Sequence, residues 1–123
     1  MLRAKIHRAT VTEANVDYEG SLTIPPDLME LADIREYEGI SVWNVTRGSR
    51  LETYAMLGLP GSRSICVNGA AAHLAGVGDK IIISAFSSVP ESEIHGFRPR
   101  VIFVDGQNRP VGSGPEVPGP RTR

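Results

Sequence analysis

The sequence has 123 residues, 41% of them hydrophobic and 22% charged, and a formal net charge of −1 at pH 7. This length allows one domain with one hydrophobic core. The near-neutral charge argues against nucleic acid as the main partner, because phosphate binding usually needs an excess of Lys and Arg. No apolar run approaches the roughly 18 residues of a spanning helix. We therefore expect neither a nucleic-acid nor a membrane partner.

The N-terminal residues place charges within the apolar pattern, as a strand does and a signal peptide does not, so we expect a cytoplasmic protein. The single cysteine, Cys66, cannot form an internal disulfide or a cysteine cluster for zinc. We expect its side chain to be buried and to pack as a small hydrophobic residue. His7, His73 and His95 lie far apart in the sequence. We therefore expect no metal site.

In the N-terminal half, short apolar segments separated by Gly, Pro or Asn predict strands. A turn is predicted at residues 17–21, and a short helix begins at Pro25-Pro26 because proline suits the first helical turn. A hairpin is predicted around residues 46–49. The predicted strands cover residues 5–12, 22–24, 39–45 and 50–57.

The C-terminal half continues this pattern. Residues 64–67, 80–84 and 101–104 predict further strands, the last two apolar enough to be buried on both faces. Pro90 and the acidic residues after it predict a short helix, and residues 70–75 form one helical turn or a loop. About seven short strands with one or two helical turns indicate a small β-barrel. Its core would be thin, so we expect side-by-side association.

The composition changes after Asp105, and eight of the 18 residues from Gly106 to Arg123 are glycine or proline. No apolar periodicity remains in this segment. We therefore expect a β-barrel domain over residues 1–105 and a disordered or loosely attached tail over residues 106–123.

Familiar catalytic motifs are missing from the sequence. It has no G-x-S-x-G, no phosphate-binding glycine-rich loop and no H-E-x-x-H, and its carboxylates are scattered. Gly20-Ser21 is one of four Gly-Ser pairs, and such a pair is usually only a turn. Its significance depends on the rest of the sequence.

Six blocks of sequence occur together in one order and at one spacing: residues 5–8, 18–21, 43–46, 53–55, 61–63 and 67–73. Together they closely resemble the pyruvoyl-dependent aspartate decarboxylases, over about residues 1–104. The most specific block is Val67-Asn68-Gly69-Ala70-Ala71-Ala72-His73. One departure is Leu22, where many relatives have cysteine or alanine after the serine. This bulkier side chain bears on the rate of self-cleavage.

The resemblance implies a double-psi β-barrel that forms a homo-tetramer with active sites at the subunit boundaries. It implies that the precursor cleaves itself between Gly20 and Ser21, so that Ser21 becomes a covalent pyruvoyl group. No metal or pyridoxal phosphate is then needed, because a carbonyl that forms an imine with the substrate accepts the electrons left by decarboxylation. The implied reaction converts L-aspartate to β-alanine and CO2 in pantothenate biosynthesis.

The resemblance also assigns roles to individual residues. Ser21 and Tyr54 are the expected catalytic residues, with Tyr54 donating the proton after CO2 leaves. Self-processing is assigned to Gly20, Ser21 and Thr53, where Thr53 supplies a donor to the oxyanion. Two further residues, His7 and Tyr18, are expected to orient their neighbours. The expected substrate-binding residues are Lys5, Trp43, Arg50, Thr53, Asn68, Gly69, Ala70 and Ala71.

Two alternatives remain open from the sequence. The first is a pyruvoyl decarboxylase of another amino acid, although the pair of cations, Lys5 and Arg50, favours a small acidic substrate. The second is a non-catalytic β-barrel that serves oligomerisation or ligand binding. This second alternative would leave the context of Gly20-Ser21 as coincidence.

Overall fold

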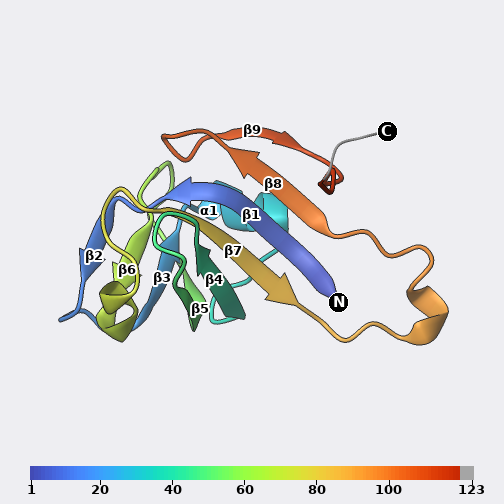
Figure 1. Cartoon of the computed structure of the whole chain (residues 1–123), viewed down its shortest axis with the longest axis horizontal. Coiled ribbons are helices and arrows are strands. Elements are labelled where there is room, and N and C mark those ends of the chain that lie inside the picture. Colours follow the sequence, from blue (N-terminus) through green and yellow to red (C-terminus); the bar gives the residue numbers. More distant parts are fainter. Residues whose placement is uncertain (120–123) are drawn as a thin grey trace.

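The computed structural model describes residues 1–119 and shows a mainly β protein (Figure 1). Besides one α-helix, α1 (Pro26–Ala32), it contains two 3₁₀ turns, η1 (Gly69–His73) and η2 (Glu91–Glu93). The mainly β class with short helical elements is therefore confirmed. The strands are β1 (Leu2–Thr10), β2 (Glu13–Asn15), β3 (Ser21–Ile24), β4 (Gly39–Asn44), β5 (Arg50–Leu57), β6 (Cys66–Asn68), β7 (Lys80–Phe86), β8 (Arg100–Val104) and β9 (Pro110–Ser113).

All nine strands form one sheet in the order β2-β6-β3-β5-β4-β7-β1-β8-β9. Strand β1 lies between β7, to which it is antiparallel, and β8, to which it is parallel. Strand β3 is antiparallel to β6 and parallel to β5. Figure 1 shows β1, β7 and β8 running across the direction of β3, β4 and β6, so the sheet is strongly curled. Its outermost described strands, β2 and β9, are not paired with each other, and the curled sheet fits the small β-barrel class.

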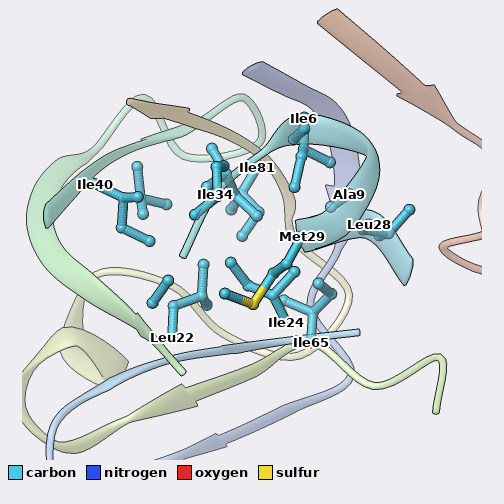
Figure 2. Packing of buried hydrophobic residues seen from close by; sticks show 14 of the residues in the cluster. Ile6, Ala9, Leu22, Ile24, Leu28, Met29, Ile34, Ile40, Ile65 and Ile81 are labelled. Atoms are coloured by element: carbon cyan, nitrogen blue, oxygen red, sulfur yellow. The ribbon is translucent and has the colours of Figure 1, made fainter. Parts of the chain in front are cut away.

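The hydrophobic core fills the inside of this curled sheet (Figure 2). Alternate residues of the strands point inward, as the period of two in a strand requires, and α1 covers them with Leu28 and Met29. Each large aliphatic side chain buried in this way contributes about 1.5–3 kcal/mol to the free energy of unfolding. Leu22 is one of them, so its bulk occupies the core.

The β4–β5 hairpin was predicted correctly, and a buried polar network holds its turn. The Asn44 amide donates to Asp79 Oδ2 at 2.8 Å, and Arg47 Nε lies 2.7 Å from the same oxygen. Burial would raise the pKa of Asp79, but hydrogen bonds from Gly76 N–H and Asn44, together with Arg47, lower it below its usual value. The charged carboxylate therefore anchors the hairpin that carries Thr53 and Tyr54.

The described part of the tail contains a paired strand, where the sequence predicted a disordered or loosely attached segment. Strand β9 pairs with β8, and the Asn108 side chain is fully buried. Its Oδ1 accepts from Thr10 N–H at 2.7 Å, and its Nδ2 donates to the carbonyls of Thr10 and Arg63 at 2.9 Å. A polar anchor of this kind leaves no apolar periodicity, so the pattern did not reveal it. Residues 120–123 lie outside the described residues, and a domain boundary at residue 105 remains a prediction.

Candidate active site

Ser21 is the first residue of β3, and its position follows from the register with β6. Ser21 lies opposite Asn68, and Leu22 lies opposite Val67. Because successive side chains of a strand point to opposite faces, Leu22 and Val67 enter the core while Ser21 and Asn68 lie on the other face. Ser21 is nevertheless only 3% exposed. The hydroxyl is therefore held in a confined polar position beside the end of the preceding loop.

The backbone at Ser21 is in a conformation that residues other than glycine rarely adopt, with φ 126°. Such a conformation costs on the order of 1–3 kcal/mol and persists only where its surroundings impose it. The preceding residue, Gly20, has no heavy atom within 4 Å of the position that a Cβ would take. The strained residue is therefore the one that follows the Gly20–Ser21 peptide bond.

Each of the two groups that could react with one another has its own hydrogen-bond donor. Tyr54 Oη donates to the carbonyl oxygen of Gly20 at 3.1 Å, and Asn68 Nδ2 donates to Ser21 Oγ at 3.1 Å. The family resemblance assigned a donor to the oxyanion at this carbonyl to Thr53. In the described structure the hydroxyl that reaches Gly20 belongs to Tyr54, while Thr53 lines an adjacent cavity.

Two cavities meet at Gly20 and Ser21. The first has a volume of about 260 Å³, and the second, which contains the exposed Tyr18, has a volume of about 430 Å³. Gly20, Ser21 and Asn68 line both of them. The first is also lined by Leu51, Glu52, Thr53, Ala70, Ala71 and Leu74, and the second by Tyr18, Glu19, Thr23, Tyr37, Tyr54, Met56 and Leu57.

Gly69 brings the loop at the start of η1 against the backbone of Gly20. It has a φ of +70°, and a Cβ placed on it would lie 2.9 Å from Gly20 Cα and 3.0 Å from Tyr18 O. Real Cβ atoms do not approach backbone atoms this closely, so only glycine fits here. The small-residue loop expected at Asn68, Gly69, Ala70 and Ala71 therefore does lie against Gly20-Ser21.

The expected substrate-binding cations lie elsewhere on the same chain. Lys5 Nζ is 2.6 Å from Glu116 Oε2, and Arg50 lies over the Trp43 ring with its Cζ 5.5 Å from the ring centroid. Neither cation is among the residues lining the two cavities. One copy of the chain therefore holds the strained Gly20-Ser21 pair without the cations expected to bind substrate.

His7 lies on β1 beside Lys5, and its Nδ1 is buried with no hydrogen-bond partner among the described residues. Its ring meets Phe103 edge-on, with centroids 5.7 Å apart. Burial, assisted by the charges of Lys5 and Arg8, lowers the pKa of His7, so the ring is neutral at pH 7. His7 is not among the residues lining the two cavities, and its orienting role remains a prediction.

Three residues that contact the expected site residues were not predicted from the sequence to do so. Cys66 and Thr23 contact the Asn68 amide, and Glu116 in the tail contacts Lys5. The alternation of residues in β3 and β6 could have placed Cys66 and Thr23, given the register of the two strands. Nothing in the sequence pattern pointed to Glu116.

No helix within residues 1–119 is long and apolar enough to cross a membrane. Over the same residues, no group of three or more His, Cys, Asp or Glu side chains is arranged to hold a metal ion.

Comparison with known proteins identifies the family. The family model described as aspartate decarboxylase matches residues 1–111. The chain belongs to the aspartate decarboxylase family. It is 58% identical to the aspartate 1-decarboxylase of Rhodopirellula baltica, with all of this chain aligned to 79% of that protein. The aspartate 1-decarboxylase of Myxococcus xanthus is 54% identical (100% of this chain, 95% of the relative), and that of Syntrophotalea carbinolica is 48% identical (97% and 91%). The family match extends past Val104, where the sequence resemblance ended, and reaches the first two residues of β9.

Proposed function

We propose that this chain is an aspartate 1-decarboxylase of the cytoplasm, which cleaves itself between Gly20 and Ser21 to form a pyruvoyl group and converts L-aspartate to β-alanine and CO2. One observation carries the proposal within the family. The strained Ser21 places its hydroxyl in a confined position next to a carbonyl, and both groups meet hydrogen-bond donors. A turn without a chemical role would not need this arrangement.

Self-cleavage follows from these groups. Ser21 Oγ adds to the carbonyl carbon of Gly20, its proton passes to the amide nitrogen, and the C–N bond breaks to leave an ester. Loss of the Ser21 Cα proton then breaks the Cβ–Oγ bond, and Gly20 departs as a carboxylate. The remaining dehydroalanine tautomerises and takes up water, releasing ammonia and leaving the pyruvoyl carbonyl.

The donors found in the structure fit the charges that develop in these steps. Tyr54 Oη faces the oxygen that becomes an oxyanion during the addition, and Asn68 Nδ2 faces the oxygen that leaves with Gly20. The departing carboxylate would thus have one donor on each of its oxygens. The strain at Ser21 also favours breakage of this bond over a relaxed one.

The residues around Ser21 also fit a pyruvoyl group at this position. The group supplies an electron sink for the pair left behind by CO2. Tyr54 carries a phenolic hydroxyl that can donate a proton to the carbon after CO2 leaves. Its hydroxyl lies beside residue 20, next to the position of the carbonyl. Asn68, Ala70 and Ala71 line the first cavity, which has room for a small substrate, and Gly69 lies against Gly20.

The separation of the cations from Ser21 supports an active site between subunits of a homo-tetramer. Lys5 and Arg50 would then act on the Ser21 of a neighbouring copy, where they bind the two carboxylates of aspartate. Arg50 offers two parallel donors to one carboxylate, and Lys5 offers a point charge. The Trp43 ring, which packs against Arg50, would form an apolar wall near the departing carboxylate.

Intact-mass analysis with a trapping assay tests the proposal. After ageing or mild heating, the chain should give two species, residues 1–20 and residues 21–123. Borohydride with aspartate should then attach aspartate covalently to the longer species, while glutamate and histidine should attach far less. A preparation that stays uncut and forms no adduct would reduce the protein to a non-catalytic barrel. Efficient trapping of histidine instead would point to another amino acid as substrate.

The close approach of Gly69 leads to a prediction for self-cleavage. Gly69→Ala should slow cleavage by at least about tenfold, because the new Cβ must displace Gly20 and the φ of +70° disfavours alanine. Gly61 has a similar φ of +80° but open space around its Cβ position, so Gly61→Ala controls for strain alone. Time courses of intact mass compare the two. Equal slowing of both variants would refute the steric argument.

The ion pair between Lys5 and Glu116 leads to a prediction for substrate binding. The Glu116 carboxylate forms an ion pair with Lys5 Nζ, and a substrate carboxylate would have to displace it to bind Lys5. Glu116→Gln should therefore lower KM for aspartate about two- to fivefold with little change in kcat, since an ion pair of this exposure is worth up to about 1 kcal/mol. Steady-state kinetics at low salt measure the change. An unchanged KM would show that the tail does not compete.

A further inference from the structure

Four polar side chains share one face where β3 and β6 pair. The register places Ser21 opposite Asn68 and Thr23 opposite Cys66. Since residues i and i+2 of a strand point the same way, all four lie together on the face away from the core residues Leu22 and Val67. Cys66 and Asn68 are each only 8% exposed. Hydrogen bonding among them therefore takes place largely away from water.

The Asn68 amide is used fully within this group. Its Nδ2 donates to Ser21 Oγ at 3.1 Å and to Thr23 Oγ1 at 3.0 Å, and its Oδ1 accepts from Cys66 Sγ at 3.0 Å. A side-chain amide has two N–H donors and one carbonyl acceptor, so its orientation decides what Ser21 receives. If the amide were turned over, its oxygen would face the two hydroxyls. Ser21 would then donate to Asn68 and would have no donor on Oγ.

The Cys66 thiol separates these two orientations. Hydroxyls can either donate or accept, so Ser21 and Thr23 tolerate both orientations. A thiol is a donor whose sulfur accepts only weakly, so Cys66 favours the orientation that presents Oδ1 to it. The thiol has one proton and two acceptors in reach, Asn68 Oδ1 at 3.0 Å and the more distant Glu13 carboxylate at 3.9 Å. Burial raises the pKa of Cys66, and the Glu13 carboxylate raises it further. The thiol therefore keeps its proton at neutral pH.

We propose that Cys66 is a positioning residue for self-cleavage, which turns the Asn68 amide so that its N–H groups face Ser21 Oγ. This inference rests on the proposed function, since it concerns the same bond. With the amide in this orientation, the oxygen that leaves with Gly20 has a donor before the reaction begins. Cys66 touches neither reacting group and acts only through Asn68.

Three substitutions separate hydrogen bonding from packing. Cys66→Ser keeps a donor in a smaller side chain, Cys66→Ala removes the donor and some volume, and Cys66→Val removes the donor but restores the volume. Freshly purified full-length chains are incubated in parallel with the unaltered chain, and the first-order rate of cleavage is followed by intact mass. Thermal melting of each variant confirms that it is folded under the conditions of the assay.

We expect Cys66→Ser to cleave within about threefold of the unaltered rate. Both Cys66→Ala and Cys66→Val should be slower than Cys66→Ser by about three- to tenfold, the effect of losing one buried hydrogen bond. Cleavage of Cys66→Val at the rate of the serine variant would overturn the inference, because volume and not a donor would then matter. Unchanged cleavage in all three variants would also overturn it. If the unaltered chain never cleaves, the proposed function itself is refuted, and this inference is refuted with it.

Discussion

Replacing Ser21 with alanine should abolish cleavage and leave one intact species of 123 residues. The substitution removes the only atom that can add to the Gly20 carbonyl in the proposed route, so the loss should be complete and should not be a partial slowing. The Asn68 amide would also lose one of its acceptors. Intact mass after prolonged mild heating measures the outcome, and the variant should show no decarboxylase activity.

A second Gly-Ser pair provides a matched control for this experiment. Gly112-Ser113 lies on the edge strand β9, where Ser113 is exposed and its φ is not positive. Ser113→Ala should therefore cleave at the unaltered rate. If Ser21→Ala still gave fragments ending near residue 20, cleavage would not use the Ser21 hydroxyl, and a contaminating protease would be the first explanation to test.

Replacing Tyr54 with phenylalanine should have the second largest effect. The substitution removes the hydroxyl that donates to Gly20 O, so cleavage should slow by about 10²-fold, as for other lost oxyanion donors. In chains that have been fully cleaved, turnover should fall by about 10²- to 10⁴-fold, because the same hydroxyl is the proposed proton donor. Intact mass measures the first effect, and β-alanine formation by the cleaved protein measures the second.

The two effects of Tyr54→Phe can be separated. Prolonged incubation brings the variant to full cleavage, after which turnover is measured per cleaved chain. Turnover equal to that of the unaltered protein would remove Tyr54 from proton donation while leaving its role in cleavage intact. Unchanged cleavage would instead return the donor at Gly20 to Thr53, which lines the adjacent cavity.

The contact of Tyr54 with Gly20 O shows what the sequence pattern could not decide at the site, and the role of Thr53 in self-processing remains a prediction. Both residues lie on the predicted strand of residues 50–57, so their neighbourhood could be expected. Adjacent residues of a strand point to opposite faces, however, and only the register with β3 and β4 decides which one faces the scissile bond. The chain's own pattern does not contain that register. The small size of residues 68–71, by contrast, is visible in the sequence, and these residues do lie against Gly20-Ser21.

For the fold, too, elements with local sequence signals were predicted and contacts between distant residues were not. Local signals were sufficient for the β4–β5 hairpin and for the start of α1 at its proline pair. The tail carries no such signal. Asn108 is held by hydrogen bonds to Thr10, 98 positions away, and to Arg63, 45 positions away. Contacts of that separation are set by the assembled sheet and leave no periodic trace in the sequence.

The position of β1 inside the sheet has a consequence for the cleaved molecule. Residues 1–20 contain β1 and β2, and β1 is paired on both sides, with Ala4, Ile6 and Ala9 fully inaccessible to solvent. Once the backbone opens, the shorter piece can leave only if β1 separates from both of its neighbours, β7 and β8, so it should stay bound. Denaturation then separates two molecules, and its midpoint should rise with protein concentration, unlike that of a single chain unfolding alone. The chain must therefore fold before it is cut.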